Sequence, residues 1–209
     1  MENKNWKDLP LVSVLLVIIN IIVFLICTFT GNLLYNRGML AVQQVLLERE
    51  YGRIVWAMFL HSDFIHIFNN MIILFFFGHM VEKEVGHIRY GLVYFFSGIG
   101  GNILSLMMKV MYSETAGTIG ASGAIFGLDG MLLALVMFSG KKLKNITPGR
   151  VVLMIFASLY GGYTGTNVDN AAHLGGVFTG FVIGVVMCIV DRIRASVFPK
   201  HHRIENTER

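Results

Sequence analysis

Long stretches without a charged side chain dominate this sequence of 209 residues. Asp, Glu, Lys and Arg are absent from 9–36, 64–81, 90–108, 151–168 and 170–190. A further stretch, 115–140, contains only Asp129. The apolar core of a bilayer is about 30 Å thick and is crossed by about 20 helical residues, with about 17 tolerated. The pattern therefore predicts an all-α polytopic membrane protein rather than a soluble domain with a large apolar core.

The composition excludes several other classes of protein. Charged residues make up 14% of the chain, whereas soluble domains average about 25%. So little charge excludes a disordered chain, and 12% aromatic residues with only 3 prolines exclude a proline-rich or collagen-like one. No linker, low-complexity tract or internal repeat is visible, so residues 1–209 are expected to form a single membrane domain.

Six transmembrane helices fit this pattern, with an interfacial outer loop between the first two. We expect the helices at 11–29, 61–80, 90–109, 121–139, 151–165 and 170–190. The fifth is the least regular, because three glycines shorten its apolar part. In the outer loop, 33–47 is too polar to span, which predicts an amphipathic helix lying in the interface. A signal peptide is disfavoured for the first helix, because no small-x-small cleavage site follows it at 27–30.

Basic residues are distributed unequally between the two sides of this arrangement. If the N-terminus is cytoplasmic, 13 of the 17 Lys and Arg residues lie on the cytoplasmic side. The other four are Arg37, Arg49, Arg53 and Lys109. Cytoplasmic loops retain positive charge, so both termini are expected to be cytoplasmic, in a bacterial-type plasma membrane. Because the basic residues are split among separate segments, we interpret them as a topology signal and expect no nucleic-acid partner.

Neither a metal nor a cofactor is indicated. Cys27 and Cys188 both lie in apolar stretches, which is typical of small buried residues rather than of a disulfide framework or a metal site. His201 and His202 are adjacent in a polar tail, and two such histidines do not form a closed metal site. We therefore expect no cofactor, and the lipid bilayer is the one partner that composition alone implies.

A few uncharged polar residues interrupt the predicted helices, where polar groups are functional candidates. Ser122 opens the fourth helix, and His173 lies near the start of the sixth. His66 and Asn70 lie four residues apart, on one face of the second helix. The three helices run in the same direction, from outside to inside, and all four residues lie in the first half of their helix. The sequence therefore predicts that they share one depth, just below the outer surface.

Such a set of residues can carry out acyl transfer. An imidazole can remove the proton of a serine hydroxyl, which makes Ser122 the candidate nucleophile and His173 its candidate base. His66 and Asn70 can donate hydrogen bonds to the oxyanion of a tetrahedral intermediate. Asp129 lies seven residues beyond Ser122, about 10 Å deeper along the helix. A Ser–His dyad is therefore favoured over a triad.

Main-chain groups around the serine fit the same chemistry. The N–H groups of Ala121 and Ser122 lie at the exposed start of a helix, where they can face an oxyanion. Gly120, with no side chain, leaves room for a carbonyl to approach. Further glycines recur every four residues, which predicts that the fourth and sixth helices pack face to face. These repeated glycines are Gly123, Gly127, Gly176, Gly180 and Gly184.

Three motifs resemble those of the six-helix bacterial rhomboid intramembrane serine proteases. Residues 120–127 read GASGAIFG and resemble the G-x-S-G nucleophile motif of that family. Residues 66–70 read HIFNN and resemble its H-x-x-x-N motif, and 172–180 read AHLGGVFTG and resemble its A-H-x-x-G-x-x-x-G motif. The motifs lie in the second, fourth and sixth predicted helices, so the resemblance covers nearly the whole chain.

The resemblance implies an endopeptidase that cleaves the transmembrane segments of single-span membrane proteins. It assigns Ser122 as nucleophile and His173 as base, with His66 and Asn70 assisting the oxyanion. It also places Phe126, where the family often has tyrosine, close enough to stack on His173. A catalytically silent rhomboid-like protein that escorts membrane clients is the alternative, and such proteins lack the serine, the histidine or both.

Other positions are less clearly assigned. The family has Trp-Arg in its outer loop, whereas Gly52-Arg53 stands here, so the anchoring of that loop is open. Asn170 can cap the sixth helix or orient the imidazole of His173. Asp129 is expected to pair with a polar neighbour or a water, and it is the one charged residue that would favour a transporter or channel instead. No sequence feature specifies the oligomeric state.

Overall fold

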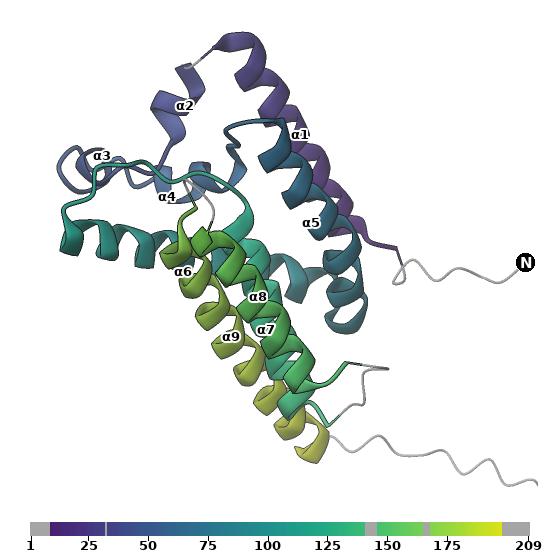
Figure 1. The fold of residues 1–209 in the computed structure, drawn as a ribbon. Coiled ribbons are helices and arrows are strands. Elements are labelled where there is room, and N and C mark those ends of the chain that lie inside the picture. Colours follow the sequence, from purple (N-terminus) through teal and green to yellow (C-terminus); the bar gives the residue numbers. More distant parts are fainter. Residues whose placement is uncertain (1–8, 32, 141–145, 165–167, 198–209) are drawn as a thin grey trace, which may run out of the picture.

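The computed structural model describes residues 9–31, 33–140, 146–164 and 168–197 (Figure 1). Within these ranges it contains helices and no strand, apart from an isolated β-bridge between Leu40 and Thr118. The predicted all-α class is therefore confirmed for the described part of the chain. Residue 165, where the fifth predicted helix ends, lies outside the described residues.

Six long helices form the body of the molecule. They are α1 (Leu11–Thr30), α5 (Phe64–Val85), α6 (His87–Tyr112), α7 (Ser122–Phe138), α8 (Pro148–Thr164) and α9 (Asn170–Val197). Among the described residues, α1, α5, α6 and α9 are long and apolar enough to cross a membrane. The apolar parts of the other two, Ser122–Phe138 and Pro148–Gly161, are shorter. Six spans thus remain a prediction, of which four meet the length criterion.

Several observed helices differ from the predicted limits by three residues or more. α6 extends the predicted 90–109 by three residues at each end, and α8 begins three residues before the predicted 151. The second predicted helix, 61–80, is α5, which begins at Phe64 because the Asp63 side chain accepts a hydrogen bond from the main-chain N–H of His66 and caps it. The last, 170–190, is α9, which continues to Val197. Its final two turns carry Asp191, which pairs with Arg89 of α6, and so lie beyond the apolar stretch.

The centre of the molecule is a close packing of α6, α7 and α9. Glycines bring α7 and α9 into main-chain contact, because a Cβ atom placed on Gly176 or Gly180 would overlap the carbonyl oxygen of Gly123 or Gly127, respectively. The predicted face-to-face packing of these two helices is therefore confirmed. As a consequence, the first turn of α7 and the first turn of α9 lie side by side.

A buried carboxylate joins α1 to α5, the pair of helices that Figure 1 shows beside this centre. Glu82 is 1% exposed and accepts hydrogen bonds from the main-chain N–H groups of Val12 and Ser13 at 2.8 and 2.9 Å. It also accepts one from the Ser13 hydroxyl at 2.6 Å, and the His87 Nδ1 atom lies 2.5 Å away. The carboxylate thereby satisfies N–H groups that the start of any helix leaves without a partner.

The loop between α1 and α5 contains short helices instead of the single amphipathic helix predicted at 33–47. These are α2 (Leu33–Gly38), α3 (Val42–Leu46), α4 (Arg53–Trp56) and the 3-10 helix η2 (Ala57–Phe59). The chain leaves the helical conformation between α2 and α3 because buried Leu40 exchanges two main-chain hydrogen bonds with Thr118. Arg53 is 7% exposed and donates to the carbonyl oxygens of Asn36 and Met39 at 2.7 and 3.0 Å. Its guanidinium anchors this loop without a tryptophan at position 52.

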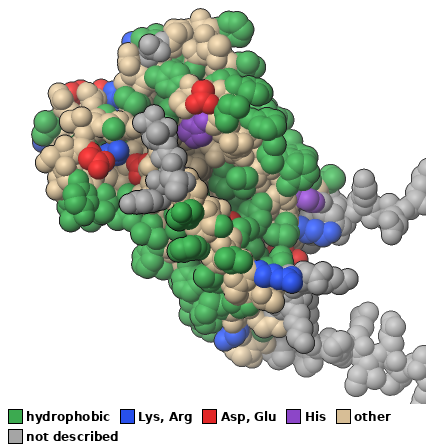
Figure 2. All heavy atoms as spheres, in the orientation of Figure 1, with side chains coloured by type: hydrophobic (Ala, Val, Ile, Leu, Met, Phe, Trp, Pro, Cys, Tyr) green, Lys and Arg blue, Asp and Glu red, His purple; other side chains and the backbone are tan. Residues whose placement is uncertain are grey.

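Large apolar side chains cover much of the outer surface (Figure 2). Phe76 of α5, Phe156 of α8 and Phe178 of α9 are 69%, 65% and 68% exposed. Soluble proteins rarely expose contiguous apolar surface of this kind, because its contact with water is unfavourable. The helices therefore present to their surroundings the surface that a lipid bilayer covers.

Candidate active site

Ser122 is the first residue of α7, and the segment before it is held on two sides. Thr118 is bridged to Leu40, and the main-chain N–H of Gly120 donates to the carbonyl of Ala57 at 2.8 Å. Gly120 has a φ of 127°, a conformation that side chains other than that of glycine rarely adopt. The hydroxyl is thus presented at a helix start on a fixed turn.

His173 lies in the first turn of α9 and is 7% exposed. Its Nε2 atom is 2.8 Å from the Ser122 hydroxyl oxygen, which is hydrogen-bonding distance. The ring of Phe126 stacks on the imidazole, with centroids 4.2 Å apart and 17° between the planes. The Nδ1 atom has no hydrogen-bond partner among the described residues. The structure therefore brings the hydroxyl and the aromatic ring of one turn of α7 together with an imidazole that is 51 residues away from Ser122 in sequence.

His66 approaches the same turn from α5. A Cβ atom on Gly120 would lie 2.9 Å from its Nε2 atom and 3.7 Å from the Ser122 hydroxyl oxygen, so the two groups face the same space. On the other side of the ring, Nδ1 lies 3.1 Å from the Ser62 hydroxyl, which donates to Asp63 at 2.7 Å. Hydrogen bonds from Ser62 and the main chain of His66 hold the pKa of the Asp63 carboxyl below its ordinary value.

Asn70 lies one turn after His66 and is 6% exposed. Its Nδ2 atom is buried and has no hydrogen-bond partner among the described residues. A buried amide donor without a partner costs free energy, so such groups point to a ligand or an intermediate that completes them. Both ring nitrogens of His61, just before α5, are likewise buried without a partner among the described residues.

His61 packs against His66 just before α5, with ring centroids 5.0 Å apart in an edge-to-face arrangement. It is fully buried, and the Tyr35 hydroxyl donates a hydrogen bond to its carbonyl oxygen. Burial lowers the pKa of His61 to about 3. The side chain is therefore neutral at physiological pH and supports the ring of His66 from behind.

The cap of α9 is Asp169, and neither of the two roles left open for Asn170, capping this helix or orienting His173, is seen among the described residues. The Asp169 Oδ1 atom accepts a hydrogen bond from the main-chain N–H of Ala172 at 2.9 Å. The side-chain oxygen of Asn170 is buried without a partner among the described residues, so Asn170 does not hold His173 either. Asp169 occupies the last position before the uncharged stretch, where an aspartate is a common helix cap, so the signal was present in the sequence.

Asp129 lies deeper on α7 and is 7% exposed. It makes no hydrogen bond or ion pair with any residue that the structure describes, so of the two expected partners, a polar neighbour or a water, the water stays a prediction. No cluster of three or more His, Cys, Asp or Glu side chains that could hold a metal occurs in the described ranges.

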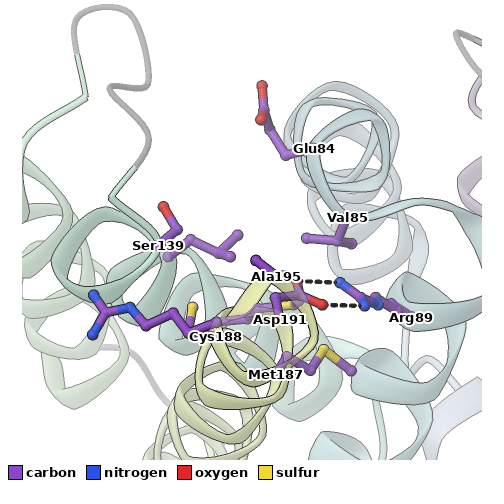
Figure 3. A pocket seen from close by; sticks show the side chains of 11 residues that line it. Glu84, Val85, Arg89, Ser139, Met187, Cys188, Asp191 and Ala195 are labelled. Atoms are coloured by element: carbon purple, nitrogen blue, oxygen red, sulfur yellow. Dashed lines mark hydrogen bonds and ion pairs between the residues drawn. The ribbon is translucent and has the colours of Figure 1, made fainter. Parts of the chain in front are cut away.

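A separate pocket of about 220 Å³ lies at the opposite end of α7 and α9 (Figure 3). It is bounded by the ion pair of Arg89 with Asp191, whose closest atoms are 2.6 Å apart, and by Ser139, which follows α7. None of the residues that line it belongs to the predicted site. The site at Ser122 is thus defined by convergent polar groups and not by this pocket.

The described helices form an apolar bundle, and at one end of it a serine and a histidine are in hydrogen-bonding contact. This combination defines a helical membrane protein with a candidate nucleophile and base. The family model of the Rhomboid domain matches residues 48–190, and the chain belongs to the rhomboid family. It is therefore a multi-pass membrane protein.

Relatives occur in both plants and bacteria. RHOMBOID-like protein 4 of Arabidopsis thaliana is 37% identical over 158 residues, which are 75% of this chain and 39% of that protein. Rhomboid protease GluP of Bacillus subtilis is 28% identical over 182 residues, covering 85% of this chain and 34% of GluP. The putative rhomboid protease YdcA of the same bacterium is 30% identical over 168 residues, or 80% and 77% of the two chains. This chain spans half or less of the length of the Arabidopsis relatives that it matches.

Proposed function

We propose that the protein is an intramembrane serine endopeptidase that cleaves transmembrane segments of single-span membrane proteins. The single observation that carries this proposal is the 2.8 Å contact between the Ser122 hydroxyl and His173 Nε2. Membership of the rhomboid family, in which GluP is named a protease, supports it. A silent escort would have no use for a hydroxyl and an imidazole held in this contact.

In the proposed reaction, His173 Nε2 takes the proton of Ser122 as the hydroxyl oxygen attacks the scissile carbonyl carbon. The tetrahedral intermediate then collapses, and the imidazolium gives that proton to the leaving amine, which leaves an acyl ester on Ser122. A water molecule, deprotonated by the same imidazole, attacks the ester, and the imidazolium returns the proton to the Ser122 oxygen as the acid is released. Phe126 restricts the ring of His173 to the orientation that both proton transfers require.

The oxyanion would be held by Asn70, His66 and the main-chain N–H groups of Ala121 and Ser122. Because the Ser62 hydroxyl donates to Asp63, its oxygen is left to accept from His66 Nδ1. A neutral His66 then carries no proton on Nε2 and can donate from that atom only as an imidazolium. The Asn70 amide donates in every protonation state, so we assign it the principal share of oxyanion binding.

Reaction with a serine-directed fluorophosphonate tests the nucleophile. The purified full-length protein in detergent should be labelled, and Ser122→Ala should not be. His173→Ala, which keeps the hydroxyl but removes the base, should be labelled far more slowly. Equal labelling of wild-type protein and Ser122→Ala would disprove the nucleophile assignment, whereas no labelling of either would favour the silent alternative.

The substrate class requires a separate experiment. Co-reconstitution with a single-span protein that carries small residues in its outer half should give a cleaved product with wild-type protein and none with Ser122→Ala. Cleavage of a soluble unfolded protein at the same rate would contradict the membrane-segment specificity.

We further propose that α7 and α8 complete six spans, with both termini in the cytoplasm of a bacterial-type plasma membrane. The excess of Lys and Arg on that side supports this orientation. Reporter fusions at the two termini and within 33–60 test it. The termini should report cytoplasm and the loop should report the outside, and the reverse pattern would overturn the orientation.

A further inference from the structure

A buried polar cluster lies beside the proposed dyad and joins three segments of the chain. The Asp169 Oδ2 atom accepts hydrogen bonds from the hydroxyls of Ser105 and Thr118, each at 2.5 Å. The Lys109 ammonium lies 3.7 Å from the same oxygen. Ser105 and Lys109 belong to α6, Thr118 precedes α7, and Asp169 caps α9. We call these four residues the Asp169 cluster.

The partners of Asp169 are buried, and its own side chain is 19% exposed. Ser105 is fully buried, and Thr118 and Lys109 are 6% and 7% exposed. Burial opposes the charge of Asp169, but hydrogen bonds from Ser105, Thr118 and the Ala172 N–H, together with the Lys109 charge, hold the pKa of Asp169 below its ordinary value of 3.8. The carboxylate is therefore ionised at neutral pH.

Two members of the cluster precede the two residues of the dyad by the same number of positions. Thr118 precedes Ser122 by four residues, and Asp169 precedes His173 by four. The contact of Thr118 with Asp169 thus ties the segment that leads to the nucleophile to the one that leads to the base. Ser105 of α6 also lies within hydrogen-bonding distance of the Thr118 hydroxyl. The bridge of Thr118 to Leu40 connects the same residue to the outer loop.

The carboxylate also carries charge close to the base. Four helical residues correspond to about 6 Å along the axis, so Asp169 lies within about one turn of His173. A negative charge at such a distance favours the imidazolium that proton transfer from Ser122 would create. Asp169 is not the acid of a Ser–His–acid triad, because His173 Nδ1 has no hydrogen-bond partner among the described residues. Its carboxylate acts on the imidazole through its charge and position instead.

We propose that Asp169 is a positioning residue that sets the separation of Ser122 and His173 by clamping the segments before α7 and α9 to α6. This inference rests on the proposed function, because the separation matters only if the two residues react. Misplacing a reacting group by about 1 Å can lower the rate about a hundredfold. Loss of the Asp169 contacts is therefore expected to affect catalysis more than stability.

The experiment compares Asp169→Asn with Asp191→Asn in the full-length protein. Asp169→Asn keeps the size and the capping oxygen of the side chain but removes its charge. Asp191→Asn is the matched control, because Asp191 also ties α9 to α6, through Arg89, at the opposite end of both helices (Figure 3). The fluorophosphonate labelling rate of Ser122 and the hydrogen exchange of 118–122 and 170–173 are measured for each.

We expect Asp169→Asn to slow labelling about tenfold to a hundredfold and to speed exchange in both segments, while Asp191→Asn labels and exchanges there like wild type. Asp169→Glu should recover part of the labelling rate. Thr118→Val should slow labelling, and combining it with Asp169→Asn should cause no further loss.

Wild-type exchange in Asp169→Asn, or equal slowing by both asparagine variants, would overturn the inference. Failure of wild-type protein to label above Ser122→Ala would instead disprove the proposed function, and exchange would still decide whether the clamp exists.

Discussion

The phenyl ring of Phe126 lies nearly parallel to the imidazole of His173, with centroids 4.2 Å apart and 17° between the planes. Phe126 is one helical turn after Ser122, so a single turn of α7 provides both the hydroxyl and the surface on which the imidazole rests. Since Nδ1 of His173 has no partner among the described residues, the stacked ring takes the orienting role that a carboxylate has in a Ser–His–Asp triad.

Replacing Phe126 tests that role. Phe126→Leu should lower kcat about tenfold at nearly unchanged KM, because the branched side chain fills the space without a flat surface for the imidazole. Phe126→Tyr should retain most of the activity, since its ring can stack in the same way. Client cleavage and fluorophosphonate labelling measure both variants, and wild-type labelling by Phe126→Leu would show that the ring is not needed.

Asn70→Ala removes the donor that we assign to the oxyanion. The expected loss is about a hundredfold or more in kcat, which is typical of one oxyanion donor, with little change in KM. Asn69→Ala, at the neighbouring exposed position of α5, is the matched control and should be nearly silent. A larger loss in KM than in kcat would mean that Asn70 binds the client rather than the transition state.

Gly176→Ala should separate α7 from α9. The added methyl group would overlap the carbonyl oxygen of Gly123, and such overpacking costs about 1–3 kcal/mol. We expect a lower unfolding temperature in detergent together with slower labelling of Ser122. Gly149→Ala, in α8, meets nothing within 4 Å and should leave both measurements unchanged or slightly raise stability.

Glu82→Ala should loosen the attachment of α1. Without the carboxylate, two N–H groups of α1 and the Ser13 hydroxyl lose their partner, a loss of roughly 2–4 kcal/mol in unfolding free energy. Thermal unfolding measures it. Glu84→Ala, which removes an exposed carboxylate of the same helix, should have little effect. Equal stability of the two variants would show that the Glu82 hydrogen bonds are offset by the cost of burying the charge.

Stability should depend on pH through Asp169. Its pKa is lower in the folded than in the unfolded chain, so its contribution is complete above the ordinary value of 3.8 and is lost as pH falls through the folded value. The difference in unfolding temperature between wild type and Asp169→Asn should therefore be constant above about pH 5 and shrink in more acidic buffer. The charged or titratable neighbours, Lys109 and His173, are common to both proteins. A difference that grows in acid would contradict the assigned sign.

Hydropathy and motif spacing predicted most of the architecture. Uncharged stretches locate helices because each must satisfy its own backbone in lipid, which imposes a length on the sequence. The predicted helices match the observed ones in number and order, and their starts agree to within three residues. The start of α5 depends on a single side chain, Asp63, whose capping contact has no length signature.

The candidate site was less completely visible in the sequence. Ser122, His173, His66 and Asn70 stand out because polar residues are rare in apolar helices. Asp169 and Thr118 do not, because they lie just outside helices, where polar residues are ordinary, and Ser105 is a single small hydroxyl within α6. Their relation is a three-dimensional contact between segments 51 and 64 residues apart, which no local pattern encodes.

The glycine contacts between α7 and α9 have an evolutionary consequence. The spacing of these helices is set where main-chain atoms meet, and the main chain is the same for every amino acid. Substitutions on the lipid-facing sides of α1, α5 and α8 can therefore accumulate without changing the distance from Ser122 to His173. A lineage can remodel the surface that meets new membranes or new clients while its reactive geometry is inherited intact.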